Sequence, residues 1–316
     1  MTSRTDRVLV VGGGGFIGRH IVAAFRDRDA GVSVMDVAPA PDDMDDLDWT
    51  TGSITDSSLM ASAADGCGTV VFLANASLPG SSHADLSGEV KAHVAATVNA
   101  AEICAELGVE RFLFASSGGT VYGYDPGPGI LLDEEARTRP RNAYGASKLA
   151  IEHYLRLIGT MRPMRPMRTL SLRLSNPYGE GQRARRAQGI IAAAMQHAMD
   201  GTVIPVWGDG SVERDFIHVS DVAAAFVAGA CYDGPRTVMN VGAGEAVSLN
   251  AILDMVREAT GRPLEADYQK TRAIDVQRNA LSIERARQEM GWAPSVGLPE
   301  GLARTARWWA SERGVA

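Results

Sequence analysis

The sequence VLVVGGGGFIG, residues 8–18, joins a short apolar run to a glycine-rich turn. The run Val8–Val11 is typical of a buried parallel strand, which is apolar on both faces. Glycines at positions 12, 15 and 18 allow a tight turn, a close approach of the backbone to a pyrophosphate, and close packing of a helix against the strand. This opening unit predicts a nucleotide-binding sheet.

The residues after the turn predict a helix. Ile17, Ile21 and Phe25 lie four apart, so one face of that helix would be buried while its N-terminus points at the phosphates. A glycine loop that was only flexible would need neither a strand before it nor a helix after it. We therefore predict that this segment binds a nucleotide.

A second apolar strand, Val32–Met35, ends at Asp36, which lies 18 residues after Gly18. A carboxylate at this position can accept hydrogen bonds from the adenosine ribose and would repel a 2′-phosphate. Asp36 therefore favours NAD over NADP as the cofactor. The alternative is that Asp36 only begins an acidic linker, because five more aspartates lie within residues 42–48.

Strands and helices alternate through the first half of the chain. Further strands are predicted at Thr69–Leu73, Phe112–Ala115 and Thr169–Leu174, with helices at Val90–Leu107 and Tyr144–Ile158 between them. This alternation predicts an α/β fold with a doubly wound parallel sheet.

Tyr144 and Lys148 stand four residues apart, which places both side chains on one face of their predicted helix. A free phenol has a pKa of about 10, and a nearby cation would lower the pKa of Tyr144 by stabilising the phenolate. Tyr144 could then take a proton from an alcohol while a nicotinamide takes the hydride. Ser117 and Asn176 follow two predicted strands, at the edge where parallel sheets bind ligands.

The overall composition excludes several classes of protein. A net charge of −7 over 316 residues argues against nucleic acid as the main partner. Three scattered cysteines predict neither a disulfide framework nor a metal site. The polar start of the chain and the lack of any membrane-length apolar run predict a cytoplasmic protein with no membrane segment.

Several motifs together give the chain a resemblance to the extended short-chain dehydrogenase/reductase family, which contains NAD-dependent nucleotide-sugar epimerases and dehydratases. The matching segments occur in the family's order over almost the whole length. They are Gly12–Gly18, Val71–Ala74, Ser116–Gly123, Tyr144 with Lys148, Leu172–Gly179, Gly208–Ser211, Arg214–Val219, Asn240–Gly242, and Arg272 with Asp275.

The resemblance implies two regions and an NAD site. Residues 1–176 with about 216–241 would form the NAD-binding Rossmann domain, and about 177–215 with 242–316 a smaller α/β substrate-binding region. The residues that would contact NAD are Gly12, Gly15, Phe16, Ile17, Gly18, Asp36, Ser53, Ile54, Leu73, Ala74, Tyr144, Lys148 and Pro177.

The resemblance also implies a nucleotide-sugar substrate, a UDP-hexose, between the two regions. In relatives the positions that match Arg214 and Arg272 clamp the substrate diphosphate, for which the planar guanidinium is well suited. Residues expected to contact the substrate are Ser117, Thr120, Asn176, Val206, Trp207, Arg214, Arg272, Asp275 and Asn279.

Two of these assignments have alternatives. Trp207 would lie near the uracil base, but a tryptophan there is nearly as typical of plain core. Asn279 stands four residues after Asp275, where relatives border the carbon-2 substituent of the sugar. The alternative for Asn279 is a side chain that faces solvent in a shifted loop.

The chain departs from the family pattern at three positions. Gly118 replaces a hydroxyl residue, so Ser117 is the first candidate to polarise the sugar hydroxyl and Thr120 the second. Ser53 replaces an aspartate that meets the adenine, and His93 replaces an asparagine near the cofactor. Both replacements keep hydrogen-bonding capacity.

The resemblance implies inversion of carbon 4 of the sugar. Tyr144 and Lys148 would remove the 4-hydroxyl proton while NAD takes the hydride, and the hydride would return to the other face of the turned 4-keto sugar. Related dehydratases and decarboxylases carry an acidic residue directly after the catalytic hydroxyl, whereas this chain has Gly118–Thr120.

Other activities stay open. They are an N-acetylhexosamine or uronate 4-epimerase, a 4-keto reductase, and a non-catalytic NAD-binding protein on the same fold. Family resemblance also implies a homodimer joined through the helices at 90–107 and 144–158.

Overall fold

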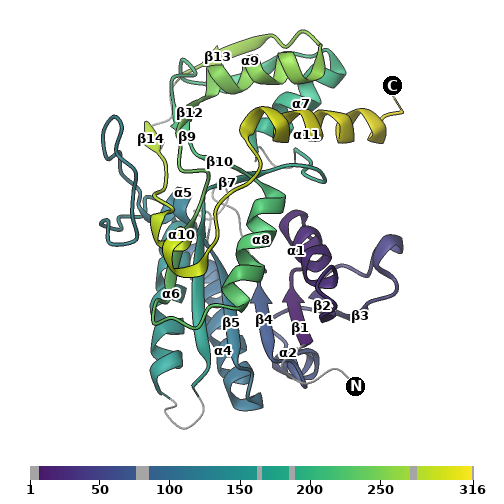
Figure 1. Cartoon of the computed structure of the whole chain (residues 1–316), viewed down its shortest axis with the longest axis vertical. Coiled ribbons are helices and arrows are strands. Elements are labelled where there is room, and N and C mark those ends of the chain that lie inside the picture. Colours follow the sequence, from purple (N-terminus) through teal and green to yellow (C-terminus); the bar gives the residue numbers. More distant parts are fainter. Residues whose placement is uncertain (1–6, 76–84, 162–165, 185–188, 271–275, 315–316) are drawn as a thin grey trace.

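The computed structural model describes residues 7–75, 85–161, 166–184, 189–270 and 276–314 (Figure 1). Its centre is a seven-stranded sheet in the order β11-β6-β5-β4-β1-β2-β3, with every neighbouring pair parallel. The strands are β1 Arg7–Val11, β2 Gly31–Asp36, β3 Asp48–Thr51, β4 Thr69–Phe72, β5 Arg111–Ser117, β6 Arg168–Leu174 and β11 Val238–Val241. The predicted parallel α/β sheet is confirmed.

Helices cover both faces of this sheet. Helices α1 (Phe16–Arg26) and α8 (Val219–Ala230) pack on one face. Helices α2 (Ser57–Ala64), α4 (Ala96–Leu107) and α6 (Ala143–Met161) pack on the other. Both halves of the double winding are therefore present.

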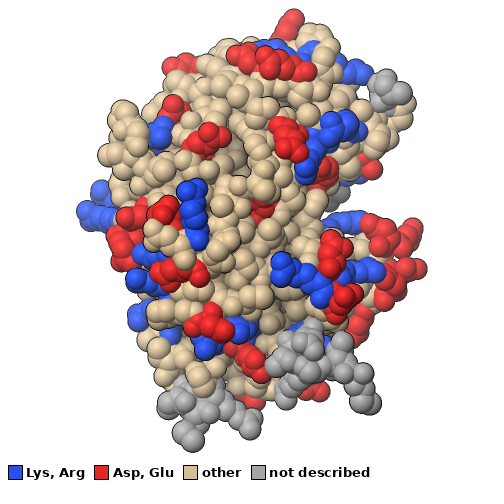
Figure 2. Space-filling model, viewed as in Figure 1, with Lys and Arg blue, Asp and Glu red and all other residues tan. Residues whose placement is uncertain are grey.

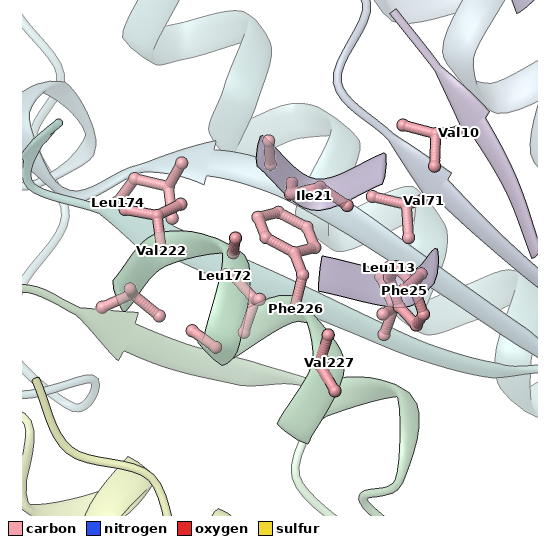
Figure 3. Packing of buried hydrophobic residues seen from close by; sticks show 14 of the residues in the cluster. Val10, Ile21, Phe25, Val71, Leu113, Leu172, Leu174, Val222, Phe226 and Val227 are labelled. Atoms are coloured by element: carbon pink, nitrogen blue, oxygen red, sulfur yellow. The ribbon is translucent and has the colours of Figure 1, made fainter. Parts of the chain in front are cut away.

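Apolar side chains from α1 and α8 meet over the sheet (Figure 3). Phe226 of α8 is fully buried together with Ile21 of α1 and with Leu172 of β6. The four-residue spacing read from the sequence of α1 thus faces the core. Truncating a buried phenylalanine of this kind to alanine costs about 3–5 kcal/mol.

The predicted helix over residues 90–107 begins earlier and is not uniform. It starts as α3 (Leu86–Glu89), passes through a π-helical segment η3 (Val90–Ala95), and continues as α4. Gly108 ends it with φ of 78°. A π-helical turn is rare and often marks a functional site, so this segment becomes a feature to follow.

The second half of the chain builds a smaller unit above the sheet (Figure 1). An apolar cluster joins α7 (Ile190–Asp200), α9 (Leu249–Thr260) and α11 (Leu298–Glu312). Ser248 is the N-cap of α9, and its hydroxyl accepts from the Ala251 amide at 3.2 Å.

Short strands complete this unit. Strand β8 (Ile204–Trp207) pairs with β13 (Ala266–Gln269), and β9 (Glu213–Arg214) lies between β12 (Val247–Ser248) and β14 (Arg278–Asn279). The remaining elements are η2 Asp42–Met44, α5 Gly118–Val121 and α10 Glu284–Met290.

The chain crosses between the two parts more than once. Strand β7 (Asn176–Tyr178), which follows β6, pairs with β10 (Phe216–His218), which precedes α8. Strand β11 then joins the sheet beside β6. On this basis we propose the discontinuous division into 1–176 with about 216–241, and about 177–215 with 242–316.

Among the described residues, no helix has both the length and the apolar character needed to cross a membrane. The same residues contain no group of three or more His, Cys, Asp or Glu that could hold a metal ion.

Candidate active site

The glycine-rich turn has the geometry that a phosphate cradle needs. Gly12 has φ of +85°, and a Cβ on it would lie 3.1 Å from the amide nitrogen of Ala74, which follows β4. A Cβ on Gly18 would lie 2.3 Å from the Gly12 carbonyl oxygen. Helix α1 begins at Phe16, and its N-cap residue Gly15 makes no side-chain cap. The first amides of α1 can therefore serve a bound phosphate.

Asp36 faces this turn. Its Oδ2 accepts from the Gly14 amide at 3.0 Å, and its Oδ1 accepts from the Ala38 amide at 3.1 Å. A carboxylate held against the turn at the end of β2 is where an adenosine ribose would reach it.

The acidic stretch that follows Asp36 behaves differently. All five aspartates within residues 42–48 are exposed, and Figure 2 shows a red patch on the side where Figure 1 places the segment between β2 and β3. Two of them pair with arginines of α1, Asp43 with Arg19 and Asp46 with Arg26. This stretch is a solvated surface and does not share the position of Asp36.

The other predicted cofactor contacts lie at strand ends. Leu73 and Ala74 are half-buried directly after β4, and Pro177 is half-buried in β7. Ser53 is exposed, and its hydroxyl accepts from the Thr55 amide at 3.2 Å in a local turn. Ile54 is partly buried against the cluster that holds α2 and α4.

Tyr144 and Lys148 both lie on α6. The Lys148 side chain is fully buried, with its Nζ 5.4 Å from the centroid of the Tyr144 ring. Nζ donates to the Ala115 carbonyl of β5 at 2.7 Å. Both side chains therefore lie on one face of α6, as the four-residue spacing predicted. That face lies against the carboxyl end of β5.

The electrostatics of this pair differ from the sequence-based expectation. Burial lowers the pKa of Lys148 to about 7, although the charges of Glu89 and Glu152 act in the opposite direction. Burial, followed by the charge of Glu89, raises the pKa of the Tyr144 phenol above its ordinary value. The expected lowering is wrong, because desolvation of the buried phenol dominates its pKa.

A buried polar network supports α6 one turn beyond Lys148. The Arg173 guanidinium donates from Nε to Glu152 Oε1 at 3.0 Å and from Nη2 to Oε2 at 2.7 Å. The Ser116 hydroxyl also donates to Glu152, while Arg173 Nη1 donates to the Tyr122 hydroxyl at 3.1 Å. This network joins β5, β6 and α6, and it fixes the strand end that carries Ser117.

Ser117 is the last residue of β5, and its side chain lies near that of Asn176. A Cβ on Gly119 would lie 3.9 Å from Ser117 Oγ and 4.0 Å from Asn176 Oδ1. The Asn176 amide donates to the Asp215 carbonyl at 2.7 Å. Thr120 Oγ1 is buried and has no hydrogen-bond partner among the described residues. Both Ser117 and Thr120 are therefore kept as candidates for the catalytic hydroxyl.

The structure explains the glycine at position 118. A Cβ there would lie 2.5 Å from Leu281 Cδ1 and 3.2 Å from the Arg173 carbonyl oxygen. Leu281 is fully buried, so a hydroxyl residue at 118 would have to displace core.

Asn279 is buried, with only 2% of its surface exposed. Its Nδ2 donates to the Gly118 carbonyl at 3.2 Å, and its Oδ1 is buried without a partner among the described residues. The alternative in which Asn279 faces solvent is therefore wrong. The side chain is anchored one residue from Ser117.

The remaining predicted substrate residues are spread along the smaller unit. Arg214 is half-buried in β9, opposite Asn279 of β14. Trp207 is 42% exposed, so it is not core, whereas Val206 is 1% exposed and belongs to the core. Arg272 and Asp275 lie outside the described residues.

The sequence analysis did not identify two carboxylates of this site, Glu152 and Glu89, or the contact between Glu89 and His93. Glu152 follows Lys148 by four residues, a spacing that could have revealed it. Glu89 precedes His93 by the same interval, and their side chains meet in the interior at 3.1 Å. Both glutamates act on the charge of Lys148, so they belong to the electrostatics of the site.

Comparison with known proteins identifies the family. A family model described as the NAD dependent epimerase/dehydratase family matches residues 8–242. A dTDP-4-dehydro-6-deoxyglucose reductase from Escherichia coli is 31% identical, over 96% of this chain and 97% of the reductase. A UDP-glucose 4-epimerase from Mycolicibacterium smegmatis is 30% identical, over 95% of this chain and 97% of that enzyme.

Solved structures give a similar picture. MoeE5 in complex with UDP-glucuronic acid and NAD superposes with a TM-score of 0.86 at 32% identity, covering 98% of this chain and 100% of MoeE5. The UDP-glucose 4-epimerase of Thermus thermophilus in complex with NAD gives a TM-score of 0.88 at 30% identity, with the same coverage.

Proposed function

Because this chain belongs to the NAD-dependent epimerase/dehydratase family, we propose that it is a nucleotide-sugar 4-epimerase that acts on a UDP-hexose. NAD is its cofactor. Support comes from the UDP-glucose 4-epimerases among its relatives at about 30% identity. A reductase of similar identity makes the substrate a question for experiment.

The glycine turn and Asp36 fit a dinucleotide. The amides at the start of α1 would hold the pyrophosphate, and the Asp36 carboxylate would accept from the adenosine ribose. Bound NAD supplies a hydride acceptor at carbon 4 of the sugar and afterwards the donor that returns it.

The proton chemistry falls to residues of α6 and β5. Tyr144 would take the 4-hydroxyl proton and later give it back, with the Lys148 ammonium favouring the phenolate. Ser117 would hydrogen-bond the same hydroxyl, with Thr120 as the second candidate. Because burial raises the pKa of Tyr144, the phenol needs more positive charge than Lys148 alone provides. Bound NAD would add the positive charge of its nicotinamide ring.

One observation carries the choice of an epimerase over a dehydratase. The turn from Ser117 to Thr120 carries no carboxylate to move protons during an elimination. Two buried carboxylates near this turn already have partners. Glu152 holds Arg173, and Asp215 accepts from the Ala243 amide at 2.7 Å and from the Leu281 amide at 3.1 Å.

The substrate would lie between the sheet edge and the smaller unit. Asn176, near Ser117, and Asn279, anchored at Gly118, are the polar groups proposed to contact the sugar. Arg214 and Arg272 are proposed to hold the diphosphate, and Trp207 the base.

The test is a substrate panel with product separation. The purified protein is incubated with UDP-glucose, UDP-galactose, their N-acetylated forms, UDP-glucuronic acid and dTDP-4-keto sugars, with and without added NADH. We expect interconversion of a UDP-hexose pair without added reductant, and its loss in Tyr144→Phe. Turnover only of keto sugars with consumption of NADH would identify a reductase instead.

Assembly and location complete the proposal. Apolar side chains on the α3–η3 stretch and on α6 are exposed, namely Leu86, Val90, Tyr154, Leu157 and Met161. An apolar surface of this kind suits an interface, so we propose a homodimer through these helices in a cytoplasmic enzyme. Light scattering of the purified protein measures its molar mass in solution and so tests the homodimer.

A further inference from the structure

His93 is a fully buried imidazole at the edge of the candidate active site. It lies on the π-helical segment η3, with its ring centroid 6.3 Å from that of Tyr144. Its Nδ1 is 3.1 Å from Oε1 of Glu89, which is itself buried. Its Nε2 is buried and has no hydrogen-bond partner among the described residues.

The charge state of His93 determines what this second nitrogen can do. Burial, and then the positive charge of Lys148, lowers the pKa of His93 to about 4, although Glu89 acts against both. The imidazole is therefore neutral near pH 7 and carries one N–H. Glu89 Oε1 lies 3.1 Å from Nδ1, and an ionised carboxylate there can only accept, which would place that proton on Nδ1. Nε2 is left as a buried lone pair.

A buried hydrogen-bond acceptor without a donor destabilises the folded protein, so the groups around Nε2 are the first place to look for a donor. The charged and titratable groups that act on His93 are Glu89 from α3 and Lys148 from α6, with the Tyr144 ring beside it. Lys148 carries three N–H groups, one of which is donated to the Ala115 carbonyl. Nε2 has no direct partner among the described residues, so a water between it and the Lys148 ammonium would supply the missing donor.

We propose that His93 is a positioning residue for the Tyr144–Lys148 pair. Glu89 fixes the Nδ1–H tautomer, and the Nε2 lone pair accepts a hydrogen bond from a water that the Lys148 ammonium holds. That bond favours the charged form of Lys148 and so the phenolate of Tyr144. The inference rests on the proposed use of Tyr144 as base, but its first two tests need no substrate.

The first test reads the tautomer. Long-range proton–nitrogen NMR of the protein with ¹⁵N-labelled histidine is recorded with and without NAD, and His93 is assigned from His93→Gln. We expect an Nδ1–H tautomer that does not titrate above about pH 5. Glu89→Gln should populate both tautomers, because an amide can donate as well as accept. A wild-type Nε2–H tautomer, or a normal titration near about pH 6.5, overturns the proposal.

The second test reads the phenolate. Absorbance near 295 nm is titrated in the NAD-loaded protein, and the Tyr144→Phe curve is subtracted to leave Tyr144. Removal of the acceptor in His93→Leu should raise the phenolate midpoint by about one pH unit, a tenfold change in the equilibrium. His93→Gln keeps an acceptor and should recover at least half of that shift.

A matched control separates positioning from packing. His218 is also buried and pairs with a glutamate, with its Nε2 3.0 Å from Glu180 Oε2. His218→Leu should lower the melting temperature without moving the Tyr144 midpoint. If His93→Leu also changes only the melting temperature, His93 is a packing residue and the proposal fails. If His93→Leu does not fold, His93→Gln and the tautomer measurement decide.

The third test uses turnover on whichever substrate the panel identifies. His93→Leu should lower kcat about tenfold and leave KM within about twofold, with partial rescue in His93→Gln. If the substrate panel shows no turnover, this test cannot be made and the proposed substrate is wrong. The tautomer and the phenolate midpoint would still test the role of His93, because neither measurement needs a substrate.

Discussion

Glu152 and Arg173 face each other in the interior as a two-point ion pair, with both carboxylate oxygens engaged by one guanidinium. Glu152→Gln should therefore leave a buried positive charge without its partner, at a cost of about 3–5 kcal/mol in the free energy of unfolding. Urea denaturation measures this change. The exposed pair of Arg304 and Glu300 provides the control, because Glu300→Gln should cost less than about 1 kcal/mol. Equal effects would show that the interior pair contributes no more than a surface pair.

Tyr144→Phe removes only the proposed acid/base oxygen. We expect kcat to fall about 10²–10⁴-fold while the fold and the bound cofactor are kept. Steady-state kinetics on the substrate found by the panel gives the first quantity, and the absorbance of the bound nucleotide gives the second. A variant within about threefold of wild type would remove Tyr144 from the role of base.

Ser117 and Thr120 compete for the role of the catalytic hydroxyl. Ser117 Oγ and Asn176 Oδ1 flank the same spot beside Gly119, which favours Ser117. We expect Ser117→Ala to lower kcat/KM more than Thr120→Ala, and less than Tyr144→Phe. The reverse order of the two alanine variants would move the role to Thr120, whose buried hydroxyl lacks a partner among the described residues.

Asp36 should set the choice of cofactor. We expect NAD to bind at least about tenfold more tightly than NADP, a difference of about 1.4 kcal/mol, because the carboxylate repels a 2′-phosphate. Asp36→Ala should narrow the gap, and titration calorimetry with both cofactors tests it. Asp43→Ala is the control, since Asp43 lies in the exposed stretch and pairs with Arg19. Equal affinity of the wild type for NAD and NADP would contradict the assignment.

Asn279 should influence which sugars are accepted. Its Nδ2 is tied to the Gly118 carbonyl and its Oδ1 is buried without a partner among the described residues, so an amide group of the substrate could be recognised there. We expect wild type to epimerise UDP-glucose and UDP-galactose and to accept the N-acetylated pair in part. Asn279→Tyr should lose the N-acetylated activity selectively, as measured by chromatography of both pairs. An unchanged ratio would take Asn279 out of the pocket.

Local patterns were enough to predict the parallel α/β sheet and its strands β1, β2, β4, β5 and β6, because that information lies in short segments. Strands β3 and β11 were not predicted. The glycines at 12 and 18 are required by contacts within a few residues or with one neighbouring strand, and the apolar runs encode strands directly. The start of α9 at Ser248 is equally local, since one hydroxyl and one amide decide it.

Features that depend on distant partners could not be predicted in the same way. In the sequence, Gly118 looks like the loss of a hydroxyl residue. In the structure, the Leu281 side chain occupies the space that a side chain at position 118 would need. The π-helical turn that carries His93 has no sequence signal of its own. The pKa of Tyr144 depends on how deeply the phenol is buried, and spacing alone does not report that.

Strand β11 forms one edge of the sheet, although residues 175–237 separate it in the chain from its neighbour β6. During synthesis, β6 therefore leaves the ribosome long before the strand that will cover it. Its unpaired backbone and apolar side chains stay exposed for that interval, which is the condition under which chains pair wrongly or aggregate. The same order means that a fragment ending before Val238 would keep the glycine turn, Tyr144 and Lys148 but leave β6 as the edge strand.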